Sequence, residues 1–176
     1  MKIAAGVPQG SLLGPTLFLI FINDIVNVYK DASFTLYADD TNVFFSSPSL
    51  IILQDQMNGF LNALSLWLSV NRMNLNIKKT KYMIFRPRGK VLAFEPVITF
   101  NALVVERVQS LKFLGVIFEE HLSWNSHILL VRREISKAVG LLNRARHVLP
   151  VKAKIMFYYS CVLLKNLLLH VGMGLH

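Results

Sequence analysis

Cysteine is nearly absent from the sequence, since Cys161 is the only one in 176 residues. A single cysteine excludes a disulfide framework and a multi-cysteine zinc site, and it is in keeping with a reducing compartment. Charged residues are also scarce at 16%, whereas hydrophobic residues make up 53%. Because disordered chains combine low hydrophobicity with high charge, this composition excludes disorder and predicts one domain or two small lobes.

Acidic residues are missing from long stretches of the second part of the chain. Residues 72–176 hold seventeen basic and five acidic residues, a formal net charge of +12, and residues 56–94 contain no acidic residue. Residues 1–71 hold two basic and five acidic residues and therefore carry −3. An acidic first part of the chain followed by a strongly basic second part favours metal chemistry next to a bound polyanion. An ordinary basic globular protein with no such partner could have the same net charge.

Long uninterrupted apolar runs are absent as well. The run 12–28 is broken by a Gly-Pro and an Asn-Asp pair, and the run 155–169 contains a lysine and an asparagine. A membrane span needs about 20 consecutive apolar residues, so a buried amphipathic helix is the favoured interpretation of 155–169. The N-terminus also lacks the pattern of a signal peptide. We therefore expect an intracellular protein, in cytoplasm and nucleus, with no stable membrane association.

Turn signals and hydrophobic periodicity predict an α+β fold for the first part of the chain. A mostly buried helix is expected over Thr16–Tyr29, and a tight hairpin joins the strands Ser33–Tyr37 and Thr41–Phe45. A second helix begins at Ser47-Pro48, with the serine as its cap, and continues to about residue 71 on a stripe of apolar residues three or four apart.

The second part of the chain is predicted to continue with strands and to end in two helices. Helices are expected from Ser123 to about residue 145 and over Val151–Leu169, separated by Pro150. The order of strands before helices is typical of an α+β rather than an alternating α/β fold. The expected strands are Met73–Ile77, Tyr82–Phe85, Val97–Val108 and Ser110–Phe118, the last broken by Gly115.

Two adjacent carboxylates, Asp39 and Asp40, stand at the tip of the predicted hairpin. Magnesium is a hard cation that prefers oxygen ligands, often one or two carboxylates together with substrate phosphates. Taken alone, the pair is explained more simply by a solvated Asp-Asp turn, because aspartate favours turns. The apolar strands on either side favour the metal interpretation, since they would bury the base of the hairpin and hold the carboxylates on a rigid platform.

A second motif precedes the first helix, where Gln9, Gly10 and Ser11 lie between Pro8 and Gly14-Pro15. Glycines let the backbone approach a ligand closely, and the glutamine amide and serine hydroxyl add polar groups at the turn. An ordinary loop and helix cap would look the same.

Taken together, these motifs resemble the palm of a reverse transcriptase, most closely the enzymes of jockey-like non-LTR retrotransposons. The resemblance continues downstream through segments similar to the family's next motif, its primer grip and the start of its thumb. It covers almost the whole chain in the family's order and spacing. The matching segments are GVPQGSLLGPTLF (6–18), IND (22–24), YADDT (37–41), LNIKKTKYMIF (75–85), KFLGV (112–116) and LSWNSHI (122–128).

The resemblance implies an RNA-directed DNA polymerase that uses Mg²⁺ or Mn²⁺, deoxynucleotides, an RNA template and a DNA primer. Asp39 would ligate the catalytic metal with Asp40 in support, and Lys79 would lie near the nucleotide phosphates. Gln9, Gly10, Tyr37 and Ala38 would form the nucleotide pocket and the floor beneath the primer end. Phe113, Leu114 and Gly115 would position the primer backbone.

The resemblance also divides the chain into a partial palm over residues 1–120, including the primer-grip hairpin, and a partial helical thumb over residues 121–176. The family's palm uses a further aspartate upstream of the segment that matches Gly6, together with a fingers lobe. None of the five residues before Gly6 is acidic. We therefore expect the 176 residues alone to be inactive in catalysis.

Basic residues on the predicted thumb helix are the expected contacts to the duplex backbone, although a solvated basic face is the simpler alternative. These residues are Arg132, Arg133, Lys137, Arg144 and Arg146. Two other functions remain open: a non-catalytic remnant that only binds nucleic acid non-specifically, and a basic helical protein that attaches to a membrane or partner through its last apolar helix. No histidine has a metal-site spacing, and Cys161 is expected to be a packed thiol.

Overall fold

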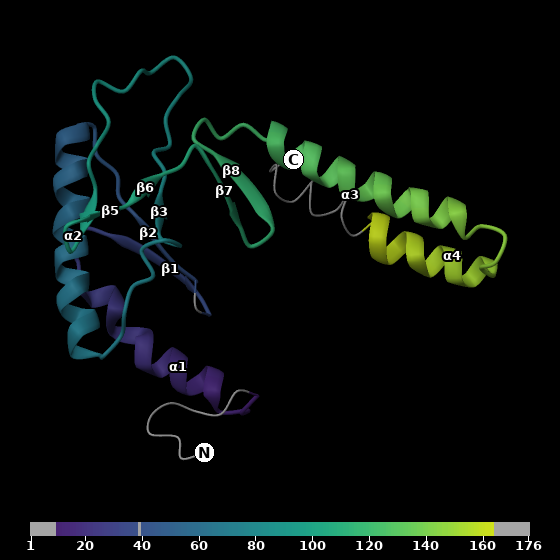
Figure 1. The fold of residues 1–176 in the computed structure, drawn as a ribbon, viewed down its shortest axis with the longest axis horizontal. Helices are drawn as coiled ribbons and strands as arrows, with labels where there is room; N and C mark the ends of the chain where they lie inside the picture. Colours follow the sequence, from purple (N-terminus) through teal and green to yellow (C-terminus); the bar gives the residue numbers. More distant parts are fainter. Residues whose placement is uncertain (1–9, 39, 164–176) are drawn as a thin grey trace. The chain divides into compact units, whose positions relative to one another are not determined.

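The computed structural model describes residues 10–38 and 40–163 (Figure 1). Contacts divide them into two compact units. The first unit consists of residues 10–38, 40–82 and 91–106, and the second of residues 83–90 and 107–163. Helices occur together with small two-stranded sheets, and six strands follow one another between α2 and α3, so the α+β expectation is confirmed at this level.

The first unit opens with the helix α1 (Gly14–Ile22), which has Pro15 in its first turn and passes into the 3₁₀-helix η1 (Asn23–Asn27). The prediction of one mostly buried helix over 16–29 is wrong on two counts. The α-helix stops at the Asn-Asp pair, whose side chains compete for backbone hydrogen bonds. Only Ile22 and Ile25 are buried, whereas most large apolar side chains of α1 are exposed.

The predicted hairpin is confirmed, with β1 (Ser33–Tyr37) paired antiparallel to β2 (Asp40–Phe44). Tyr37 is the register partner of Asp40, so two residues connect the strands. Ala38 has a φ of 51°, the left-handed conformation that tight hairpin loops require. A non-glycine residue is strained there by roughly 1–2 kcal/mol, and strain of this kind gathers at functional turns.

The helix α2 (Leu50–Val70) packs against the base of this hairpin. Its buried side chains are Phe60, Leu61, Leu64 and Leu68, four members of the predicted stripe. The Phe60 ring meets the rings of Tyr29, Phe34 and Phe45 at centroid distances of 6.2, 5.8 and 5.6 Å. The predicted cap, Ser47, is wrong, because the residue at the helix N-cap is Ser49. The Ser47 hydroxyl instead accepts a hydrogen bond from the Ser49 backbone N–H at 3.2 Å.

The remaining strands of the first unit are shorter than predicted. Two-residue strands pair as β4 (Thr99–Phe100) with β5 (Leu103–Val104) and β3 (Lys81–Tyr82) with β6 (Glu106–Arg107). The prediction of one strand over 97–108 is wrong because Asn101 and Ala102 have φ values of 47° and 64°, which reverse the chain. The segment 73–77, predicted as a strand, forms none.

The second unit begins with a hairpin of β7 (Ser110–Phe113) and β8 (Val116–Glu119). The predicted break at Gly115 is confirmed: Leu114 and Gly115 connect the strands with φ values of 46° and 89°. The helices α3 (Asn125–Arg144) and α4 (Val151–Tyr158) follow, and the π-helix η2 (Tyr159–Leu163) continues from α4. The rest of the helix predicted to residue 169 lies outside the described residues.

Within the described ranges, no helix is both long and apolar enough to cross a membrane.

Candidate active site and nucleic-acid interface

The tip of the β1–β2 hairpin brings together Tyr37, Ala38 and Asp40, all of them exposed. Phe34 and Phe45, at the base of the hairpin, contact Phe60 of α2. These contacts attach the hairpin to the helix and so fix the position of its tip. Asp39 and Gln9 lie outside the described residues. Asp40 is thus held at the start of β2 with its carboxylate accessible to a ligand.

Gly10 and Lys79 are both exposed and belong to the same unit as the hairpin. Gly10 has a φ of 85°, which explains the glycine, and a Cβ added there would meet no atom within 4 Å. Lys79 lies in a turn closed by its own backbone N–H, which donates to the Asn76 carbonyl at 3.0 Å. No hydrogen bond or ion pair within the described ranges joins either residue to the hairpin tip.

The described residues do not form a complete metal site by themselves. Among them, no three histidine, cysteine or acidic side chains gather closely enough to hold a metal ion. The hairpin tip offers the Asp40 carboxylate, which is the right chemistry for Mg²⁺ but too few ligands for a two-metal centre.

The predicted primer-grip residues lie at the turn of the second hairpin. Phe113 is half-buried at the end of β7, whereas Leu114 and Gly115 are exposed, with 53% of the Leu114 surface accessible. An exposed leucine at a tight, well-defined turn is available to contact a ligand.

A buried ionic cluster anchors the base of this second hairpin and was not predicted from the sequence. The Glu120 carboxylate, only 9% exposed, lies 3.2 Å from an Arg86 nitrogen, 2.8 Å from an Arg107 nitrogen and 3.3 Å from His121 Nε2. We call these four residues the Glu120 cluster. Breaking such a buried pair typically costs about 3–5 kcal/mol, because it leaves a buried charge uncompensated. The one available signal was the Glu-Glu pair in an otherwise basic region.

Glu119, the neighbour of Glu120, holds the beginning of α3. Its carboxylate accepts hydrogen bonds from the hydroxyls of Ser123 and Ser126. These bonds, with a smaller contribution from the positive charge of Arg88, hold the pKa of the Glu119 carboxyl below its ordinary value. A negative charge at this place also suits the positive end of the helix dipole.

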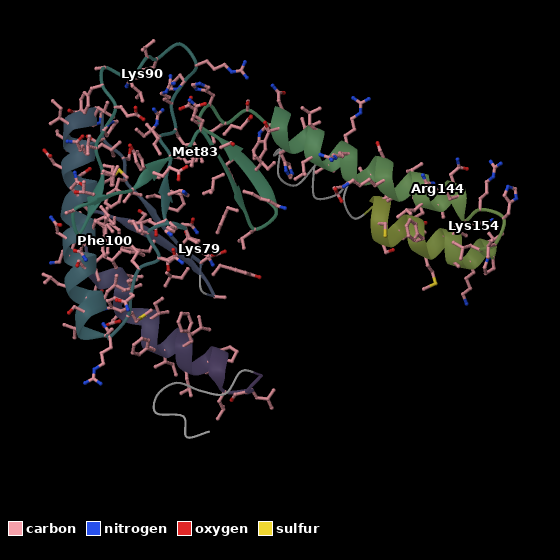
Figure 2. All side chains as sticks on the ribbon, in the orientation of Figure 1. Lys79, Met83, Lys90, Phe100, Arg144 and Lys154 are labelled. Carbon is pink, nitrogen blue, oxygen red and sulfur yellow. The ribbon has the colours of Figure 1, made fainter. Side chains whose placement is uncertain are left out.

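Four of the five predicted backbone contacts share one exposed face of α3, which we call the α3 basic face. They line a shallow groove together with uncharged and apolar side chains, and Figure 2 shows Arg144 near the end of the helix. Lys137 donates to Glu134 at 3.0 Å, a pair exposed to solvent. The groove is lined by Arg132, Arg133, Lys137 and Arg144, with Leu129, Ser136, Gly140 and Leu141.

Arg146 is the exception, because α3 ends at Arg144. The expectation that it lies on the same helix is therefore wrong. Its Nε donates to His147 Nε2 at 2.8 Å in the turn that follows.

Comparison with known proteins agrees with these motifs. The chain is 28% identical over 168 residues to the RNA-directed DNA polymerase from mobile element jockey of Drosophila melanogaster, covering 90% of this chain and 18% of that protein. The jockey polymerase of Drosophila funebris is 28% identical over 175 residues, covering 94% of this chain and 19% of that protein. The probable polymerase from transposon X-element of Drosophila melanogaster is 26% identical over 143 residues, covering 79% and 15%.

The chain therefore spans about a fifth of the length of the curated relatives it matches. No solved structure matches it. The model of the family described as reverse transcriptase (RNA-dependent DNA polymerase) matches residues 1–118, which is most of the chain and includes both hairpins. The chain belongs to the reverse transcriptase family.

Proposed function

We propose that these residues form part of an RNA-directed DNA polymerase of a non-LTR retrotransposon. Residues 1–120 act as a partial palm with the primer grip, and residues 121–176 as a partial helical thumb. The observation that carries the proposal is the β1–β2 hairpin, which packs through Phe34 on the buried Phe60 ring and opens β2 with the exposed Asp40. The same proposal places the protein inside the cell, in cytoplasm and nucleus.

In this proposal Asp39 and Asp40 hold Mg²⁺ or Mn²⁺ at the hairpin tip. In a two-metal site the ions activate the attacking hydroxyl and stabilise the leaving oxygen of the phosphoryl transfer. The chain's own residues do the positioning. Tyr37 and Ala38, with Gln9 and Gly10, border the deoxynucleotide, and Lys79 supplies a positive charge toward its phosphates. Further ligands must come from residues other than those described, because Asp40 alone does not complete a site.

The α3 basic face binds the phosphate backbone of the RNA template paired with the DNA primer. Its arginines are exposed, and only Lys137 has an acidic partner that the structure shows. Arginine forms charge-assisted, often bidentate hydrogen bonds with phosphate, and such contacts carry no sequence information. We expect binding that is indifferent to sequence and weakens steeply as salt increases. Phe113, Leu114 and Gly115 position the primer backbone.

Reversing three charges on the α3 basic face should abolish this binding. The variant is Arg132→Glu, Arg133→Glu and Arg144→Glu, measured by fluorescence anisotropy with a labelled RNA–DNA duplex at several salt concentrations. Each lost phosphate contact should lower the salt dependence, the slope of log K against log salt, by about 0.9, and the glutamates add repulsion.

The matched control reverses three exposed basic residues of the first unit, Lys30, Arg72 and Lys78. This control should lose much less affinity than the α3 variant, although the net charge changes equally. Equal loss in both variants would contradict a specific track on α3, and undiminished binding by the α3 variant would show that the track is misplaced.

A non-catalytic nucleic-acid-binding remnant is the second candidate. It is favoured by one observation, the exposed basic residues of α3, which can bind phosphates without any metal ion. Both candidates bind the duplex. They differ in whether the hairpin carboxylates catalyse DNA synthesis, and primer extension measures this difference.

A further inference from the structure

The loop between β3 and β4 contains a basic turn, residues 86–90, that belongs to the second unit. It is closed on itself, because the Lys90 backbone N–H donates to the Pro87 carbonyl at 3.1 Å and the Arg86 guanidinium donates to the Lys90 carbonyl. It is also tied to the end of β8, since the Arg86 backbone N–H donates to the Glu120 carbonyl at 2.9 Å. These three hydrogen bonds fix the backbone of the turn.

The Glu120 cluster adds further contacts between the turn and the end of β8. Glu120 pairs with Arg86 of the turn and with Arg107, and His121 Nδ1 contacts the Arg86 carbonyl at 3.0 Å. The Arg86 side chain is thus held by the Glu120 carboxylate, and the Arg86 backbone is held by Glu120 and His121. Arg86 is therefore a structural residue, and it is not available to a ligand.

Arg88 and Lys90, in contrast, are exposed, and Figure 2 shows Lys90 on this loop. Within the described residues neither forms an ion pair. Arg88 acts on Glu119 only through its charge, and the Glu119 carboxylate is already engaged by Ser123 and Ser126. The turn thus presents two uncommitted cations on a fixed backbone.

We propose that Arg88 and Lys90 form a second phosphate-binding site for the nucleic-acid backbone, separate from the α3 basic face. The inference rests on the proposed function, since it assumes that the chain binds nucleic acid. A solvated basic loop would need no such restraint. Because the turn is already fixed before binding, it loses little conformational entropy when it contacts a phosphate, and the contact therefore contributes more to the affinity. Both the turn and α3 belong to the second unit.

The test is the double variant Arg88→Gln and Lys90→Gln, measured with the same labelled RNA–DNA duplex over a range of salt concentrations. Both side chains are exposed and make no side-chain hydrogen bond in the described part, so the fold should be unchanged. We expect the salt slope to fall by about two and the affinity at 0.1 M salt to fall by roughly tenfold.

The matched control is Lys30→Gln with Arg72→Gln, which removes two exposed charges from the first unit. Its salt slope should equal that of the unaltered protein. An unchanged slope in the Arg88–Lys90 variant, or an equal fall in the control, would overturn the second site. If the unaltered protein does not bind the duplex at all, the proposed function fails. If it binds and only the α3 variant loses affinity, the proposed function stands and this inference alone is wrong.

Discussion

Glu119 and Glu120 are adjacent in the sequence but hold different parts of the second unit. Glu120 is buried and pairs with two arginines, whereas Glu119 accepts hydrogen bonds from two serine hydroxyls at the beginning of α3. The sequence shows that these two acids stand in a basic region, but it does not show their partners. The partners of Glu120 are Arg86 and Arg107, which lie 34 and 13 residues away in the sequence. Separations of that kind are set by the tertiary fold, so no local pattern predicts them.

Replacing Glu119 by glutamine should remove a pH-dependent contribution to stability. Because the folded pKa of Glu119 lies below its ordinary value of 4.5, its charge stabilises the fold above that pH, and the stabilisation is lost as the pH falls below it. The melting temperature of the Glu119→Gln variant should therefore be lower at pH 7 and approach that of the unaltered protein below pH 4. In a background that carries Ser123→Ala and Ser126→Ala and so lacks both hydroxyl donors, Glu119→Gln should show no such convergence. Parallel curves for Glu119→Gln and the unaltered protein would contradict the assignment.

At the scale of elements, the sequence predicted best where apolar periodicity and a partner surface coincide. The spacing along α2 identified its buried face, and the β1–β2 hairpin and the strand break at Gly115 were confirmed. The same reasoning failed for α1, since a run of apolar residues does not reveal what covers it. It failed for 97–108 because two left-handed residues, Asn101 and Ala102, reverse a chain that reads as one strand.

The helix α2 offers a matched pair of leucines to test this account of the core. Leu64 is 7% exposed and Leu66, two residues later on the same helix, is 72% exposed. Leu64→Ala should lower the free energy of unfolding by about 2–5 kcal/mol through lost burial and the remaining cavity. Leu66→Ala should change it by about 0.5 kcal/mol or less, because its side chain is already in water. Urea denaturation measures both, and similar values would mean that α2 packs on a different face.

At the scale of the whole molecule, the order of the motifs predicted the family, which the match over residues 1–118 confirms. The division into a palm up to residue 120 and a thumb beyond it stays a prediction. The two structural units divide differently, because residues 83–90 join the second unit through the Glu120 cluster. No periodicity in the sequence indicates that residues 83–90 belong to the second unit, because their attachment depends on long-range ion pairs. The roles of Asp39, Asp40 and the other site residues also stay predictions.

The central claim is that the Asp39–Asp40 hairpin takes part in RNA-directed DNA synthesis. The most direct measurement is primer extension on an RNA template, with deoxynucleotides and Mg²⁺ or Mn²⁺. It compares residues 1–176 alone with a hybrid in which they replace the matching segment of the Drosophila melanogaster jockey polymerase. The matched control is Asp31→Asn, an exposed aspartate of the first unit to which no role is assigned.

We predict no extension by the 176 residues alone and extension by the hybrid. Asp39→Asn should lower the hybrid rate by at least about 10²–10³-fold, because it removes a charge that stabilises the transition state, whereas Asp31→Asn should leave the rate unchanged. A hybrid that extends primers equally well with Asp39→Asn would contradict the catalytic assignment, and one that binds the duplex without extending it would favour the non-catalytic remnant.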